Sequence, residues 1–222
     1  MIDMRRIFFF LLCLPVLAVS CNLNVIIGDD VEVMERRDFD SSATAIAVSM
    51  GFDVVLDSSV ELGVVEVVTS QNIMEYVEVY VEDGTLHIGL VQNNYYHVDT
   101  LEAHLSPALF RSFAVSGGSE IESYDLIDTT DDIAIAASGG SEVTLKGRCN
   151  GVAVSVSGGS DVDLEELEAQ HVSAAVSGGS DLSVYAVKGL EVSATGGSEV
   201  EYKGEPIIKD FKTSGGSSIE RN

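Results

Sequence analysis

Hydrophobic and polar residues alternate with a period of two over most of residues 113–222, and one short motif interrupts the alternation at regular intervals. Ser-Gly-Gly-Ser begins at residues 116, 138, 157, 177 and 214, and Thr-Gly-Gly-Ser begins at 195. Alternation is typical of strands with one buried face. A repeat near 20 residues is typical of a solenoid or an array, so this half of the chain predicts stacked, nearly identical units.

The residues that flank the motif repeat as well. Hydrophobic residues stand three positions before its start and two positions after its end, namely Phe113, Ile135, Val154, Ala174, Val192 and Phe211, and then Ile121, Val143, Val162, Leu182, Val200 and Ile219. Each repeat therefore predicts two strands joined at a corner, where glycine adopts a positive φ without steric penalty. Helix-forming runs are nearly absent, so we expect an all-β solenoid of about six coils, stacked at about 4.8 Å.

Residues 38–112 are also rich in strand patterns but are less regular. The segment 47–54 is a degenerate copy of 114–121, and Asp83-Gly84 between alternating runs predicts a hairpin. Residues 71–76 suggest one helical turn. No Pro- or Ser-rich linker separates the two halves, so we expect a single β-solenoid domain over 38–222, with an irregular part at 38–112 and regular coils at 113–222.

The first twenty residues have the pattern of a signal peptide. Two arginines precede the apolar run 7–19, and small residues lead up to Cys21. The string Ala-Val-Ser-Cys resembles a bacterial lipobox, in which the cysteine is acylated. We therefore expect an exported protein anchored by lipid on Cys21 in the cell envelope, at the outer membrane, with residues 21–37 as anchor and linker. Ordinary secretion with a free Cys21 thiol is the alternative.

Charge removes some classes of function. The chain has 36 Asp and Glu against 12 Lys and Arg, a formal charge of -24 that disfavours a nucleic-acid partner. A hydrophobic content of 45% excludes a disordered acidic tail. If Cys21 is acylated, Cys149 has no disulfide partner, and stability must come from packing. Cys149 lies in a segment that reads as a turn, with no histidine close in sequence, so we expect no catalytic thiol there.

The residue after each motif is acidic in five of six repeats, namely Glu120, Glu142, Asp161, Asp181 and Glu199. Parity places these side chains outward, and stacking in register would bring carboxylates about 5 Å apart, at a cost of about 1 kcal/mol per pair in water. Two interpretations stay open. One is a weak Ca²⁺-binding face centred on Asp161, Asp163 and Asp181. The other is a solvated face that prevents sheet aggregation. No other cofactor is predicted, and the four histidines show no metal-ligand spacing.

Taken together, these elements resemble the putative auto-transporter adhesin head-domain (GIN) family of exported Bacteroidetes proteins. The resemblance covers about residues 38–220 and is carried by Phe39, 46–49, 52–56, 84–88, 106–109 and the Ser-Gly-Gly-Ser coils. It implies a right-handed parallel β-helix and an envelope location. It implies no activity, because the family supplies no catalytic residues.

The function expected from the sequence is a non-enzymatic envelope lipoprotein that acts as an adhesin or as a surface interaction or structural module. Tyr95, Tyr96 and His97 are the candidate patch for a glycan or protein ligand, although a loop that packs its tyrosines on the solenoid end would look the same. The alternative is a carbohydrate-binding or carbohydrate-active β-helix enzyme, but no nucleophile elbow, phosphate loop or zinc motif is present. Self-association through exposed strand edges is a further hypothesis.

Overall fold

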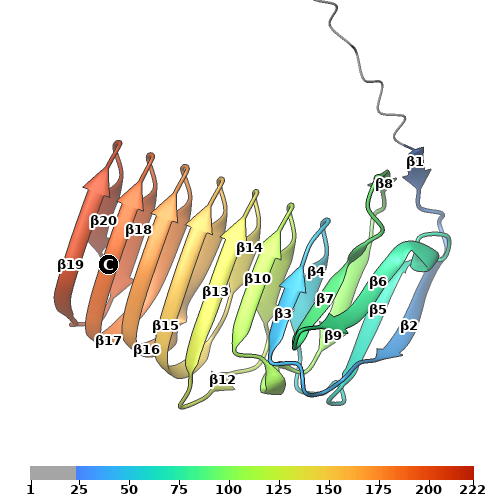
Figure 1. Ribbon diagram of the computed structural model, residues 1–222, viewed down its shortest axis with the longest axis horizontal. Coiled ribbons are helices and arrows are strands. Elements are labelled where there is room, and N and C mark those ends of the chain that lie inside the picture. Colours follow the sequence, from blue (N-terminus) through green and yellow to red (C-terminus); the bar gives the residue numbers. More distant parts are fainter. Residues whose placement is uncertain (1–23) are drawn as a thin grey trace, which may run out of the picture.

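The computed structural model of the protein describes residues 24–222 and is a rod of stacked coils (Figure 1). Its elements are strands except for two short 3₁₀ helices, η1 (Met74–Tyr76) and η2 (Pro107–Leu109), of which η1 falls in the helical turn expected at 71–76. Two sheets run along the rod, and consecutive coils pair in parallel. The β-solenoid predicted from the sequence is confirmed.

The front sheet consists of the strands that lead into the corners. Its order along the rod is β6 (Val77–Glu82), β7 (Thr85–Leu90), β3 (Ala45–Val48), β10 (Ser112–Ser116), β13 (Asp132–Ser138), the second halves of β15 (Gly147–Ser157), β16 (Asp161–Ser177) and β17 (Asp181–Thr195), and β19 (Ile207–Ser214). Only β6 runs antiparallel to its neighbour. From β7 to β19 this sheet is about 34 Å long at the usual strand spacing.

The back sheet consists of the strands that leave the corners. Its order is β2 (Glu32–Asp38), β5 (Val64–Ser70), β9 (Leu101–Leu105), β4 (Asp53–Leu56), β11 (Glu120–Ser123), β14 (Glu142–Thr144), the first parts of β16 and β17, β18 (Glu199–Lys203) and β20 (Ser218–Arg221). A short third side is formed by β12 (Ile127–Asp128) and the middle segments of the long strands. The ribbon of β1 (Asn24–Ile27) and β8 (Asn94–His97) lies at one end.

The chain does not follow the rod from end to end. The coil of β3 and β4 pairs with β10 and β11 on one side and with β7 and β9 on the other. Met50 and Gly51, between β3 and β4, have φ values of 68° and 78°, close to the 66° and 72° of Gly117 and Gly118. The degenerate copy expected at 47–54 is therefore a true coil of the stack.

The N-terminal end of the rod is finished by antiparallel strands. Strand β6 covers β7, while β5 and then β2 cover β9. The segment assigned from the sequence to an anchor and linker, 21–37, thus contributes β1 and all of β2 except Asp38 to the folded body. Their weak alternation hid this role, because both strands lie at an edge and expose most of their side chains.

The core lies between the two sheets and is built from the flanking hydrophobic positions of the repeats. Phe113, Ile135 and Val192 on the front sheet and Ile121 and Val143 on the back sheet are almost fully buried. Cys149 is buried inside β15, so the turn expected around it is wrong. Its side chain alternates inward from β15, and the neighbouring glycine and asparagine residues belong to the same strand.

The corners form one row along the upper edge of the rod in Figure 1. Both glycines of each corner have a positive φ, but they differ in their surroundings. A Cβ on Gly178 would lie 3.0 Å from the amide nitrogen of Gly158 in the preceding corner, whereas a Cβ on Gly179 would meet nothing within 4 Å. The first glycine is therefore required by stacking and by φ, and the second by φ alone.

The second serine of each corner is buried, except the half-buried Ser217 of the last corner, and from the third corner onward it joins one coil to the previous one. The Oγ of Ser180 donates to the carbonyl of Ser177 at 2.9 Å and accepts from the amides of Gly159 and Ser160 at 3.1 and 3.3 Å. Equivalent bonds from neighbouring coils are made by Ser198 and Ser217. The serine hydroxyls thus form a ladder that satisfies corner backbone groups hidden from water.

Candidate functional site

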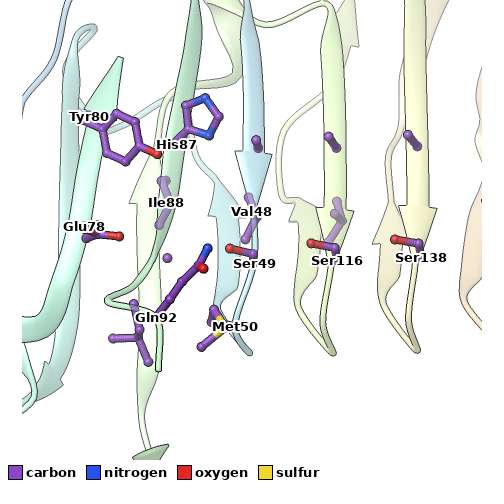
Figure 2. Close-up of a pocket in the computed structure, with 16 residues that line it drawn as sticks. Val48, Ser49, Met50, Glu78, Tyr80, His87, Ile88, Gln92, Ser116 and Ser138 are labelled. Carbon is purple, nitrogen blue, oxygen red and sulfur yellow. The ribbon is translucent and has the colours of Figure 1, made fainter. Parts of the chain in front are cut away.

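A groove on the outer side of the front sheet, near the N-terminal end, encloses about 420 Å³ (Figure 2). Its floor is made of small side chains on β3, β10 and β13 and at the residue that follows β3, namely Ala47, Ala114, Ala136, Ser116, Ser138 and Ser49. Its wall is formed by larger side chains on β6 and β7 and in the segment that follows β7. The antiparallel β6–β7 hairpin carries large outward side chains, and the parallel coils beside it carry small ones. The groove lies at the step in height between them.

The wall carries a pair of stacked rings. Tyr80 on β6 faces His87 on β7, with ring centroids 4.9 Å apart and an angle of 10° between the ring planes. Glu78 lies beside them on the same strand, and Gln92 and Met50 close the groove toward the corner (Figure 2). Tyr80 is 46% exposed, so its ring offers an apolar surface to a ligand.

The floor of the groove continues along the front sheet as a row of small side chains in register. Ala47, Ala114, Ala136, Ser155, Ala175 and Ser193 are cross-strand neighbours between His87 at one end and Lys212 at the other. This row carries no acidic side chain, although the whole chain has a charge of -24. Acidic side chains stand beside the row, with Glu78 near one end and Glu191 and Asp210 near the other.

The lining of the groove offers several kinds of contact to a ligand. Glu78 is the only carboxylate among its sixteen lining residues, whereas glycoside hydrolysis generally uses two carboxyl groups. The serine hydroxyls stand in a row without a carboxylate–histidine pair to activate them. The arrangement combines one ring pair, one amide, one carboxylate and several hydroxyls, which can stack against a ligand and form hydrogen bonds with it.

Most of the repeated acids stand in one row on the outer side of the back sheet. The register pairs Glu102 with Asp53, Asp53 with Glu120, and then Glu120, Glu142, Asp161, Asp181 and Glu199 in sequence. We call this row the acidic ladder. The stacking of carboxylates that was expected from the repeat is confirmed.

Three carboxyl groups of the acidic ladder have raised pKa values. Partial burial, followed by the neighbouring carboxylates, raises the pKa of Asp53, Glu120 and Asp161. Asp53 and Glu120 also line a hollow of about 230 Å³ with Glu102, Glu122, His104 and Tyr124. Because the pKa of Asp161, which lies outside this hollow, is also raised by burial and neighbouring carboxylates, the raised pKa values follow from the ladder and do not single out a catalytic site.

We expect Glu120→Gln to stabilise the protein at pH 7 by about 0.5 kcal/mol, because it removes one like charge from a partly solvated row. A carboxyl group whose pKa is raised by folding destabilises the folded state when it is ionised, so the penalty of Glu120 develops as the pH rises from its ordinary value of 4.5 through the raised value. Thermal unfolding of both proteins at pH 7 and pH 4 measures this difference. An advantage of the variant that persists at pH 4, or that is unchanged in high salt, would contradict an electrostatic origin.

The comparisons with known proteins agree with this architecture. The family model described as "Putative auto-transporter adhesin, head GIN domain" matches residues 43–206. The chain belongs to this family. Membership indicates an exported protein of the cell surface or envelope, as the resemblance implied. Among curated proteins, none matches the chain significantly.

Solved structures of Bacteroidetes proteins share the fold of this family member. A "putative adhesin" from Bacteroides fragilis superimposes with a TM-score of 0.71 at 17% identity, over 89% of this chain and 100% of that one. A "putative lipid binding protein" from Parabacteroides distasonis gives 0.57 at 16% identity, over 90% and 100%. A "putative adhesin" from the same organism gives 0.50 at 16% identity, over 90% and 100%. At these identities the likeness concerns the fold alone.

In this member of the adhesin head-domain family, the acids considered for calcium lie side by side on the back sheet. Asp161 is the cross-strand neighbour of Asp181, while Asp163 pairs with Ser183 and its Oδ1 accepts the amide of Glu165 at 2.9 Å. Within residues 24–222 no three His, Cys, Asp or Glu side chains gather closely enough to hold a metal ion. Calcium binding stays a prediction, which a thermal shift in millimolar calcium would test.

The candidate patch at Tyr95, Tyr96 and His97 is divided by the structure. These residues form strand β8, where Tyr96 turns toward the core, its ring 5.7 Å from that of Tyr76, and donates its hydroxyl to the Val91 carbonyl at 2.8 Å. Tyr95 and His97 point the other way and are exposed. The three residues therefore do not form one binding surface.

The two cysteines of interest are in different situations. Cys21 lies outside the residues that the structure describes, so its acylation stays a prediction. Burial, followed by the nearby charge of Asp132, raises the pKa of Cys149 to about 11. A buried thiol with a raised pKa is a weak nucleophile at neutral pH.

Sequence reasoning did not identify the groove, although one signal for it was present. The predicted two-residue hairpin at Asp83-Gly84 fixes the pairing of β6 with β7 and places Tyr80 opposite His87. The small residues of the floor follow from the outward positions of each repeat. What the sequence did not indicate was that this hairpin pairs with β3, because β7 follows β3 by about forty residues.

No helix within residues 24–222 has the length and apolar character needed to cross a membrane.

Proposed function

We propose that the protein is a non-enzymatic adhesin of the cell envelope and that the front groove binds an uncharged glycan. The single observation that carries this proposal is the Tyr80–His87 ring pair set beside a floor of small residues and hydroxyl groups. Sugar rings present an apolar face to aromatic side chains and hydroxyl groups to polar ones, and the groove offers both.

Charge argues for a neutral ligand. Glu78 lies in the wall of the groove, and the whole protein is strongly negative, so an acidic polysaccharide would be repelled. A neutral sugar avoids this cost. The Ala floor leaves room for a flat ring against the sheet, while Gln92, Ser49 and Ser116 supply hydrogen-bonding groups around it.

Tyr80→Ala should weaken glycan binding about tenfold, because it removes the stacking surface and exposes only a small side chain in its place. A glycan array identifies the ligand for the wild-type protein, and isothermal titration then compares the variants. The matched control is Tyr124→Ala, since Tyr124 is 56% exposed and lines the acidic hollow on the back sheet. Equal loss in both variants would contradict the assignment to the front groove, as would full binding by the Tyr80 variant.

We propose further that Cys21 carries the lipid that holds the adhesin in the envelope. The lipobox-like string before Cys21 and the membership of an adhesin head-domain family support this anchor. More than one acyl chain on the cysteine makes attachment stable, whereas a single chain gives marginal binding. Metabolic labelling with palmitate tests the anchor, because Cys21→Ala should lose both the label and the membrane fraction, while Cys149→Ala should keep both. Label retained on the Cys21 variant would refute it.

A further inference from the structure

The ribbon of β1 and β8 at the N-terminal end has one packed side and one bare side (Figure 1). Ile26 and Tyr96, which are cross-strand neighbours, turn inward and pack against the core. Val25, Ile27 and Tyr95 turn outward and are 65%, 63% and 65% exposed. We call these three residues the outer face of the ribbon.

The outer face is an apolar surface, and it is bordered by His97, which is exposed on the same side of the ribbon and lies opposite Ile27. Val25 lies directly opposite Tyr95, and Ile27 follows two residues later on the same side of the strand. The inner side holds the ribbon firmly, since Tyr96 is bonded to the Val91 carbonyl and Asn72 binds the carbonyl of Ile27 at 2.7 Å. The three exposed side chains are therefore presented on a fixed backbone, and their exposure does not come from a loose end.

Covalent geometry places this surface next to the proposed anchor. Asn24 is three positions after Cys21, and three steps of fully extended chain span at most about 11 Å. The inference thus rests on the proposed acylation of Cys21. With lipid on that residue, the ribbon starts within the depth of the headgroup layer of the membrane.

We propose that the outer face of the ribbon lies against the bilayer surface and seats the N-terminal end of the rod on the membrane. Its side chains suit this environment, because Val and Ile enter the acyl boundary while tyrosine prefers the interface between headgroups and hydrocarbon. Asp29 and Asp30 follow the ribbon directly and are exposed, so a zwitterionic surface fits better than an anionic one. Strand β19, at the opposite end, then stands away from the membrane (Figure 1).

Site-specific fluorescence in vesicles tests the contact. The full-length protein, processed with its own lipid, is reconstituted in phosphatidylcholine vesicles as the Tyr95→Cys or the Ile207→Cys variant, labelled with a polarity-sensitive dye and exposed to brominated lipid. Ile207 is the matched control, because it is 76% exposed on β19. The native Cys149 is buried with a pKa of about 11 and does not compete for the dye. We expect quenching at position 95 to be at least threefold greater than at position 207.

Equal quenching at the two positions would contradict the proposed contact between the outer face of the ribbon and the bilayer. Vesicle flotation separates this result from failure of the anchor, since a chain without lipid does not float at all. A second variant, Ile27→Asp on the Tyr95→Cys background, should float normally but lose the quenching, because a carboxylate cannot enter the acyl boundary. A second copy of the chain or another protein could instead cover position 95. The dye would then be shielded from water but not quenched by brominated lipid, and this result would contradict the proposal.

Discussion

Gly178→Ala should lower the free energy of unfolding by about 3 kcal/mol. A positive φ costs a residue with a Cβ about 1–2 kcal/mol, and at Gly178 the backbone has a φ of 77°. The added Cβ would also lie 3.0 Å from the amide nitrogen of Gly158. The neighbouring corner is held by coils on both sides and has little room to give, so a further overpacking cost is expected. Urea unfolding followed by circular dichroism measures the change.

Gly179→Ala is the matched control, because it has a similar φ of 71° but open space around the new Cβ. We expect it to cost about 1 kcal/mol, the conformational penalty alone. Equal losses in the two variants would show that close stacking of the corners adds nothing to the need for glycine.

Ser180→Ala should lower the free energy of unfolding by about 2–3 kcal/mol, because it leaves buried backbone groups without partners. The hydroxyl of Ser180 accepts from the amides of Gly159 and Ser160 and donates to the Ser177 carbonyl. Alanine fills most of the same volume but replaces none of these bonds. The same urea experiment measures the loss.

The control for the serine ladder lies in the same corner. Ser177 opens the motif and is half-buried, and within the described part of the chain its hydroxyl forms no hydrogen bond. Ser177→Ala should therefore change stability by less than about 0.5 kcal/mol. If both serines cost the same, the ladder of hydroxyls is not what joins the coils, and the repeated serine would need another reason.

The repeat made the solenoid predictable because each of its positions has a single physical task. In each repeat, glycines adopt a positive φ, the second serine of the motif provides a hydroxyl group to the corner, and the flanking hydrophobic residues alternate into the core. Because six repeats place the same demands on the same positions, they predict one structure. The coil at 47–54 was recognisable for the same reason, although Met50 replaces the first glycine. Met50 opens the row of corners and is exposed, so its side chain has solvent on one side where later corners have a neighbour.

The N-terminal part was less predictable because its contacts are long-range. Nothing local in residues 24–38 indicates that β2 pairs with β5 or that β1 pairs with β8, since such pairings depend on where the whole chain returns. The same applies to the groove, which needs β7 to pair with β3. The tyrosine patch was expected as one site because sequence neighbours were treated together, whereas a strand sends Tyr95 and Tyr96 to opposite sides.

The corner has a consequence for how such proteins change length. From the corner at 157 onward, each coil presents to the next a similar set of donors, acceptors and glycine gap, so a duplicated segment of 18–22 residues would find its bonding partners already in place on both sides. Insertion or loss of a whole repeat would shift the far end of the rod by about 4.8 Å and leave the N-terminal ribbon and the groove untouched. The length of the rod can therefore change in evolution by one repeat at a time, without a change in the groove.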